Sequence, residues 1–263
     1  MTVPERAGQL LVALDVEGLD QATTLLDKLS GVVTGCKIGN QLFTAAGPAA
    51  VEAARKRGFR VFLDLKYHDI PNTVAGAVRE ATRLGVFMLN VHAGGGLGMM
   101  RAAAEAATKA AKDLAVPRPI CLGVTVLTSL DRHALDAELG IVSTVESHVL
   151  RLAGLAKAAG LDGCVASARE IGPLRLQFGK KFVIVTPGIR PAGGPRHGPP
   201  DPPTALRPTE SVTAIPGGDD QVRTATASGA IEAGADYIVV GRPITAAPNP
   251  KAAAQAVLEE LRG

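Results

Sequence analysis

RVFLDLKYHDIPNT, residues 60–73, joins an apolar run to charged residues and a helix start within one short stretch. The run 60–66 is nearly continuous in apolar residues, as expected of a strand that is covered on both faces. Pro71 suits the first turn of a helix, because its missing N–H has no partner to lose there. The stretch therefore predicts one strand–helix unit, with its charges at the junction.

The same alternation of an apolar run and an amphipathic stretch recurs along the chain. Runs of this kind lie at 10–16, 33–39, 60–66, 87–93, 120–127, 163–167, 182–186 and 237–240. Strands that alternate with helices imply a parallel sheet, and eight units in about 250 residues match a (β/α)8 TIM barrel. A doubly wound open sheet is the alternative fold.

The chain has 263 residues, with 28 Lys and Arg against 25 Asp and Glu, and a net charge of +3. This balance indicates neither a nucleic-acid partner nor a membrane surface, and 3% aromatic residues offer few platforms for base stacking. A chain of this length buries enough surface to need no disulfide or metal for its core. We expect one α/β barrel domain over residues 1–263.

The three cysteines, Cys36, Cys121 and Cys164, lie in or beside apolar runs, and no two are close in sequence. The pattern indicates buried thiols rather than a disulfide framework or a zinc site. Glu5 and Arg6 precede a short apolar run, so no signal peptide is predicted and a cytoplasmic protein is expected. Motifs for a metal or a dinucleotide cofactor are not found in the sequence, and neither is expected.

One segment interrupts the alternation, residues 191–218 between the seventh predicted strand and the helix after it. It holds eight of the chain's 18 prolines and five glycines. Proline removes backbone donors and glycine adds freedom, so irregular structure is predicted. At 28 residues it is longer than an ordinary strand–helix connection, and we interpret it as a lid or a tolerated surface insertion.

Charged residues of alternating sign follow the first three predicted strands: Asp15, Lys37, then Asp64 with Lys66. Residues two apart in a strand point to the same side, so Asp64 and Lys66 are expected to share a face. A carboxylate beside an ammonium keeps the amine charged, and such a lysine can donate a proton to a carbanion. The alternative is a structural ion pair. His92, after the fourth strand, could line the same pocket.

A second group of residues suits a phosphate. Gly241 and Arg242 follow the last predicted strand, and Arg190 and Gln221 flank the same position. Glycine lets backbone N–H groups approach an anion, and arginine binds phosphate with two parallel hydrogen bonds. Barrel enzymes commonly hold phosphate after their seventh and eighth strands. The alternative for any one arginine is a solvated position on a turn.

Seven motifs, in order along nearly the whole chain, resemble orotidine 5′-phosphate decarboxylase of the common bacterial type. They are ALDV at 13–16, KIG at 37–39, DLKYHDIPNTV at 64–74, VTVLTS at 124–129, TPGIRP at 186–191, GDDQ at 218–221 and GADYIVVGRPIT at 234–245. The resemblance implies decarboxylation of orotidine 5′-monophosphate to UMP and CO2 in de novo pyrimidine biosynthesis, without cofactor or metal.

The resemblance also implies a role for each site residue. Asp64 would lie against the leaving carboxylate, Lys66 would stabilise the carbanion and protonate C6, and Lys37 with Asp69 would complete an alternating Lys/Asp array. In this family the site lies at a homodimer interface. Asp69, Ile70 and Thr73 would reach into the partner's site. The ribose hydroxyls would be held by Asp15, Lys37 and Thr73, and the pyrimidine by Thr128. The phosphate would be held by Arg190, Gln221, Gly241 and Arg242.

Two other functions remain open at this stage. A Mg²⁺-dependent sugar-phosphate decarboxylase or aldolase of the same superfamily would resemble this chain around the third strand. Those enzymes carry an acidic metal ligand where this chain has Lys37, whose charge would repel the metal. A non-catalytic nucleotide-binding barrel is the second. The segment 191–218 also departs from the family, in which the corresponding loop is usually short.

Overall fold

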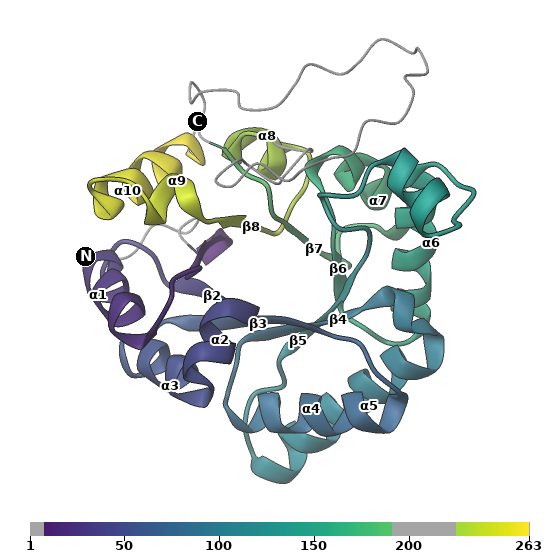
Figure 1. The fold of residues 1–263 in the computed structure, drawn as a ribbon, viewed down its shortest axis with the longest axis horizontal. Coiled ribbons are helices and arrows are strands. Elements are labelled where there is room, and N and C mark those ends of the chain that lie inside the picture. Colours follow the sequence, from purple (N-terminus) through teal and green to yellow (C-terminus); the bar gives the residue numbers. More distant parts are fainter. Residues whose placement is uncertain (1–7, 191–224, 263) are drawn as a thin grey trace.

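The computed structural model describes residues 8–190 and 225–262, and their strands form a closed parallel barrel (Figure 1). The strands pair in sequence order, and β1 pairs with β8. Their bounds are β1 (Leu10–Ala13), β2 (Gly35–Gly39), β3 (Arg60–Tyr67), β4 (Met88–His92), β5 (Ile120–Val124), β6 (Gly163–Val165), β7 (Val183–Thr186) and β8 (Tyr237–Val240). The predicted (β/α)8 barrel is confirmed, and the doubly wound open sheet is excluded.

Helices surround the barrel as an outer ring. They are α1 (Leu19–Leu29), α2 (Asn40–Ala46), α3 (Pro48–Lys56), α4 (Pro71–Arg83), α5 (Gly96–Leu114), α6 (Val145–Ala158), α7 (Ile171–Phe178), α8 (Ala227–Glu232), α9 (Arg242–Thr245) and α10 (Pro250–Glu260). Pro71 occupies the first turn of α4 as predicted. The short helices α2 and α9 were not predicted, because each has fewer than eight residues and follows its strand with at most one residue between them.

Two apolar clusters stabilise the barrel. The larger fills the space between the strands and the helices. The smaller lies inside the barrel and includes Leu11, Phe62, Met88, Leu122 and Val185. Phe62 also lines the cavity described below, so the inner cluster forms its floor. The barrel is therefore a packed core that opens at the C-terminal ends of its strands.

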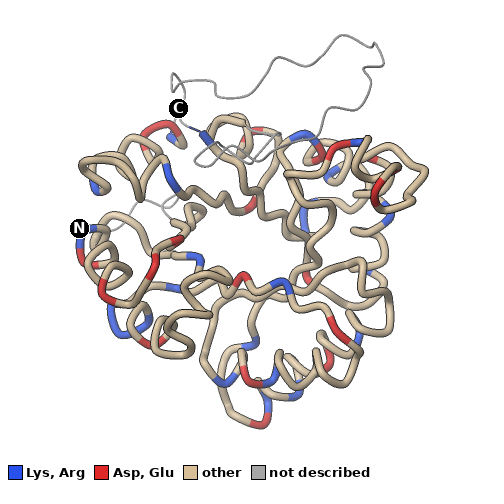
Figure 2. The backbone as a smooth tube through the Cα atoms, in the orientation of Figure 1, with Lys and Arg blue, Asp and Glu red and all other residues tan. Residues whose placement is uncertain are grey.

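Cys36, Cys121 and Cys164 are buried, as predicted, and burial raises the pKa of each thiol to about 12. They are inert small side chains in the core. Lysines, arginines and acidic residues are interspersed around the outer ring (Figure 2). Among the described helices none is long and apolar enough to cross a membrane.

The predicted insertion, residues 191–218, lies outside the described residues, as does Gln221. The residues on either side of the gap are held together. Ile189 and Ala225 form a parallel β-bridge, and the Arg190 N–H donates to the Ala225 carbonyl at 2.9 Å. The chain therefore leaves and re-enters the described fold at one place, beyond the C-terminal end of β7.

Candidate active site

A cavity of about 620 Å³ opens at the C-terminal ends of the strands. Most of the polar residues predicted from the sequence line it: Asp15, Lys37, Asp64, Lys66, Thr128, Arg190, Gly241 and Arg242. Its apolar wall comes from Val124, Val126, Leu127, Val165, Ala166 and Pro187. A cavity that combines a charged side with an apolar side suits a ligand with both kinds of surface.

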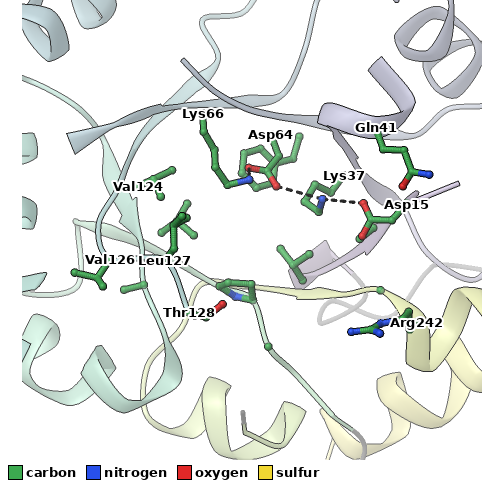
Figure 3. Close-up of a pocket in the computed structure, with 18 of the residues that line it drawn as sticks. Asp15, Lys37, Gln41, Asp64, Lys66, Val124, Val126, Leu127, Thr128 and Arg242 are labelled. Atoms are coloured by element: carbon green, nitrogen blue, oxygen red, sulfur yellow. Dashed lines mark hydrogen bonds and ion pairs between the residues drawn. The ribbon is translucent and has the colours of Figure 1, made fainter. Parts of the chain in front are cut away.

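The charged side is a continuous chain of four side chains from three adjacent strands and their ends. Lys37 Nζ lies 3.2 Å from Asp15 Oδ1 and 3.2 Å from Asp64 Oδ2. Lys66 Nζ lies 2.8 Å from Asp64 Oδ1. Figure 3 shows Lys37 between the two carboxylates, with Lys66 on the far side of Asp64. The charges alternate, as the sequence predicted.

This arrangement keeps buried groups ionised. Burial alone lowers the pKa of Lys37, but the carboxylates of Asp64 and Asp15 outweigh it and raise that pKa overall. Burial likewise raises the pKa of Asp64, but the ammonium groups of Lys37 and Lys66, with hydrogen bonds from Lys66 and Asn90, lower it overall. The chain therefore presents fixed opposite charges to the cavity across neutral pH.

The backbone that carries Lys66 is irregular. Asp64 and Lys66 do meet on one side of β3, as predicted, but Lys66 has φ +51°, a left-handed conformation unusual for a side chain of this size. The Lys66 N–H donates to Asn90 Oδ1 at 2.8 Å, and Asn90 Nδ2 donates to Asp64 Oδ1 at 2.7 Å. Sequence analysis assigned Asn90 no role. Its signal was a single amide within the apolar strand MLNVH.

The other side of the cavity carries the arginines. Arg242 begins α9 directly after Gly241, and it lies across the pocket from Lys66 (Figure 3). Arg190 enters the lining from beyond β7, next to Gly188. Two guanidinium groups beside glycine backbone can bind a dianion such as a phosphate. Gln221, predicted for the same group, lies outside the described residues.

Three predicted site residues are not part of the cavity lining: Asp69, Ile70 and Thr73. They belong to an exposed run that joins β3 to α4 and includes the first turn of α4. The Asp69 carboxylate accepts the N–H of Ile70 at 2.6 Å, and Ile70 is 67% exposed. Within one chain, Asp69 therefore does not complete the Lys/Asp array. An exposed isoleucine close in sequence to the charged side chains of the cavity is typical of a surface that contacts another protein.

His92 and Gln41 differ in their position relative to the cavity. His92 is half-buried and absent from the described lining; its ring packs on that of His68, with centroids 5.5 Å apart. Burial, then the charges of His68 and Lys66, lower the pKa of His92. Gln41 does line the cavity and lies beside Asp15 (Figure 3). The sequence analysis missed Gln41 because it lies on α2, which was not predicted.

Comparison with known proteins shows the family of this chain. A model of the orotidine 5′-phosphate decarboxylase / HUMPS family matches residues 8–257. The orotidine 5′-phosphate decarboxylase of Moorella thermoacetica is 51% identical over 253 residues, which cover 96% of this chain and 92% of that protein. That of Teredinibacter turnerae is 45% identical over 254 residues, 97% of each chain.

A solved structure shares the fold over nearly the full length. The crystal structure of orotidine 5′-phosphate decarboxylase from Lactobacillus acidophilus has a TM-score of 0.79 and 34% identity, covering 97% of this chain and 100% of that one. The matched region contains every described residue that lines the cavity. This chain therefore belongs to the orotidine 5′-phosphate decarboxylase / HUMPS family.

Proposed function

We propose that this chain decarboxylates orotidine 5′-monophosphate to UMP and CO2, the reaction named for its relatives. The observation that carries the proposal is the Asp15–Lys37–Asp64–Lys66 chain, which faces an apolar wall while two arginines lie at the other side of one cavity. Each part corresponds to one part of this substrate: a reacting carboxylate, a flat base and a phosphate.

The arginines fix the orientation of the substrate. With the phosphate at Arg190, Gly241 and Arg242, the ribose hydroxyls reach Asp15 and Lys37. The pyrimidine then lies between Thr128 and the apolar wall, and its C6 faces Lys66. Binding energy from the remote phosphate can in this way hold the reacting carbon against the charged chain.

The chemical step needs a proton and a fixed field. The bond between C6 and the carboxylate breaks, CO2 leaves, and the electron pair remains on C6. The Lys66 ammonium donates its proton to C6, giving UMP and a neutral amine that solvent reprotonates. Asp64 beside the substrate carboxylate raises the ground-state energy, and this repulsion ends as CO2 departs. Lys37 keeps Asp64 ionised throughout.

The exposed run that contains Asp69, Ile70 and Thr73 supports a shared site in a homodimer. Asp69 carries the acidic group that the array lacks beyond Lys66, and it is not among the residues that line its own cavity. Ile70, 67% exposed, would be covered by the partner. We propose that each copy lends these three residues to the site of the other, with Thr73 near the ribose.

The first experiment follows the ultraviolet absorbance of orotidine 5′-monophosphate in the presence of EDTA-treated protein. Loss of absorbance with release of one CO2 per UMP supports the proposal and shows independence of metal. No turnover, together with tight UMP binding, indicates a nucleotide-binding barrel. Neither turnover nor binding, with turnover of a sugar phosphate on adding Mg²⁺, indicates the sugar-phosphate lyase instead.

The shared site is tested by co-expressing Lys66→Ala and Asp69→Ala chains with different affinity tags and purifying the mixed dimer. Each variant alone is expected to be nearly inactive. In a mixed dimer one of the two sites receives both wild-type residues, so roughly half of the wild-type activity per dimer is expected. Activity no greater than that of the single variants would contradict sharing. Analytical ultracentrifugation checks the dimer independently.

A further inference from the structure

We infer that Asn90 is a positioning residue that sets the geometry of Asp64 and Lys66, an inference that rests on the proposed decarboxylation. Asn90 is the third residue of β4, is 0% exposed, and does not line the cavity. It reaches no substrate itself. It acts through the two side chains that carry the proposed chemistry.

The pairing of β3 with β4 is irregular. Leu63 pairs with Leu89, and Tyr67 pairs with Val91, so three residues of β3 lie opposite Asn90 alone. Such a bulge leaves backbone groups without ladder partners and redirects side chains. The bulge contains both Asp64 and Lys66, and this is where Lys66 takes its left-handed φ of +51°.

The Asn90 amide replaces the ladder contact that is missing at the bulge. Its Oδ1 accepts the Lys66 N–H at 2.8 Å, which satisfies a donor that the bulge would leave unpaired. A left-handed backbone at a lysine is unfavourable on its own and persists only where the surroundings hold it. The buried amide is the contact that holds it.

Asn90 also holds the Asp64 carboxylate. Asn90 Nδ2 donates to Oδ1 at 2.7 Å, the same oxygen that lies 2.8 Å from Lys66 Nζ. This fixes the rotation of the carboxylate so that Oδ1 faces Lys66 and Oδ2 faces Lys37. One side chain with one donor and one acceptor is needed, and asparagine supplies both. Leucine, of similar size, supplies neither, and aspartate loses the donor.

The test compares Asn90→Leu with wild type. We expect kcat to fall about 30-fold or more, because misplaced charges stabilise the transition state poorly. KM and the Kd of UMP are expected to change less than about 3-fold, because the phosphate contacts are untouched. A merely structural role would not produce this division between kcat and binding. Wild-type kcat in a folded Asn90→Leu protein would overturn the inference.

Leu89→Ala is the matched control. Leu89 precedes Asn90 on β4 and belongs to the core between strands and helices. Its truncation leaves a cavity and lowers the Tm, yet kcat is expected to stay within about 2-fold of wild type, because no polar contact of the site changes. If Leu89→Ala loses kcat as Asn90→Leu does, the effect is general destabilisation and the inference fails.

A second variant and a crystal structure complete the test. If Asn90→Leu does not fold, the isosteric Asn90→Asp is judged by the same kcat criterion. A crystal structure of the folded variant provides a readout without activity: Lys66 is expected to leave the left-handed region and to lose its contact with Asp64. An unchanged Lys66 backbone would overturn the inference. If wild type itself does not decarboxylate the substrate, the proposed function fails while this arm still decides the role of Asn90.

Discussion

Both ends of the barrel contain ion pairs with an aspartate in or beside a strand, but the pairs are built differently. At the C-terminal ends, carboxylates contact lysines that face a cavity. At the N-terminal ends, carboxylates contact arginines and also accept backbone N–H groups from a neighbouring strand. An ion pair next to a strand therefore indicates a structural or a functional role only once the other contacts of its carboxylate are known.

The two ion pairs at the N-terminal ends share one arrangement. Asp162 immediately precedes β6, and its carboxylate accepts the Cys121 N–H of β5 at 2.7 Å while Arg118 Nη1 donates to it. Asp236 immediately precedes β8, accepts the Ile184 N–H of β7 at 2.7 Å, and is held by Arg175. Each aspartate ties one strand start to the preceding strand. The Arg118 guanidinium contacts both oxygens of Asp162, whereas the contacts of Asp236 with Arg175 and with the Ile184 N–H both go to Oδ2.

The C-terminal array satisfies its carboxylates with side chains instead. Lys37 and Lys66 hold Asp64 from two sides, and both lysines line the cavity. Lysine is a compact cation that can release a proton, whereas arginine is permanently charged and suits fixed planar contacts. The comparison predicts that changes at the C-terminal end affect turnover, and that changes at the N-terminal end affect stability.

The largest expected effect is on turnover in Lys66→Ala. Loss of the proton donor is expected to lower kcat about 1,000-fold or more, with a Tm near that of wild type because the side chain partly faces solvent. The matched control is Lys109→Ala, which removes an exposed lysine of α5 and should leave kcat unchanged. The absorbance assay measures both. Near-normal turnover in Lys66→Ala would remove Lys66 as proton donor.

At the opposite end, Asp162→Asn is expected to lower the free energy of unfolding by about 2 kcal/mol, because a charged partner of Arg118 and of the Cys121 N–H becomes neutral. Its kcat should equal that of wild type. Asp113→Asn, at an exposed pair on α5, should cost less than about 0.5 kcal/mol. Urea denaturation measures both. A lower kcat in folded Asp162→Asn would break the division between the two ends.

Much of the fold followed from local pattern, because strands buried on both faces leave apolar runs that helices separate. Pro71 marked its helix for a physical reason that holds in isolation. The predicted fifth strand, 120–127, is wrong at its end, since β5 stops at Val124. Residues 126–128 are apolar or β-branched and line the cavity, and sequence alone does not separate a cavity wall from a strand.

Site residues could be predicted from the sequence where the type of side chain and its place at a strand end are enough to indicate its role. Asp15, Lys37, Asp64 and Lys66 follow from alternating charge at neighbouring strand ends. Asn90 did not, since its role depends on a bulge that places three residues opposite one. The position of Asp69 outside its own cavity lining also has no sequence signal, because a surface for a second copy looks like any exposed loop.

A substitution at Gly39 tests how far the charges of the C-terminal array can move without loss of activity. A Cβ added to Gly39 would lie 3.0 Å from Lys37 Nζ and 3.5 Å from Asp15 Oδ1. The flexible end of Lys37 can move aside, so Gly39→Ala should fold normally while kcat/KM falls about 10-fold through a displaced charge. Gly18→Ala, where nothing lies within 4 Å of the added atom, is the control. Equal kcat/KM in both variants would show that the array tolerates this shift.

The smallest expected effect is a pH dependence of stability that belongs to Asp64. Its pKa in the folded protein lies below the ordinary value because Lys37 and Lys66 outweigh burial. A carboxylate with a lowered folded-state pKa contributes stability above its unfolded pKa of about 3.9 and loses it as the pH falls through the folded-state value. The difference in unfolding free energy between wild type and Asp64→Asn should therefore be constant from about pH 6 to 8 and shift against wild type below about pH 4. A difference that shifts in favour of wild type in acid would mean that burial, and not the two lysines, dominates at Asp64.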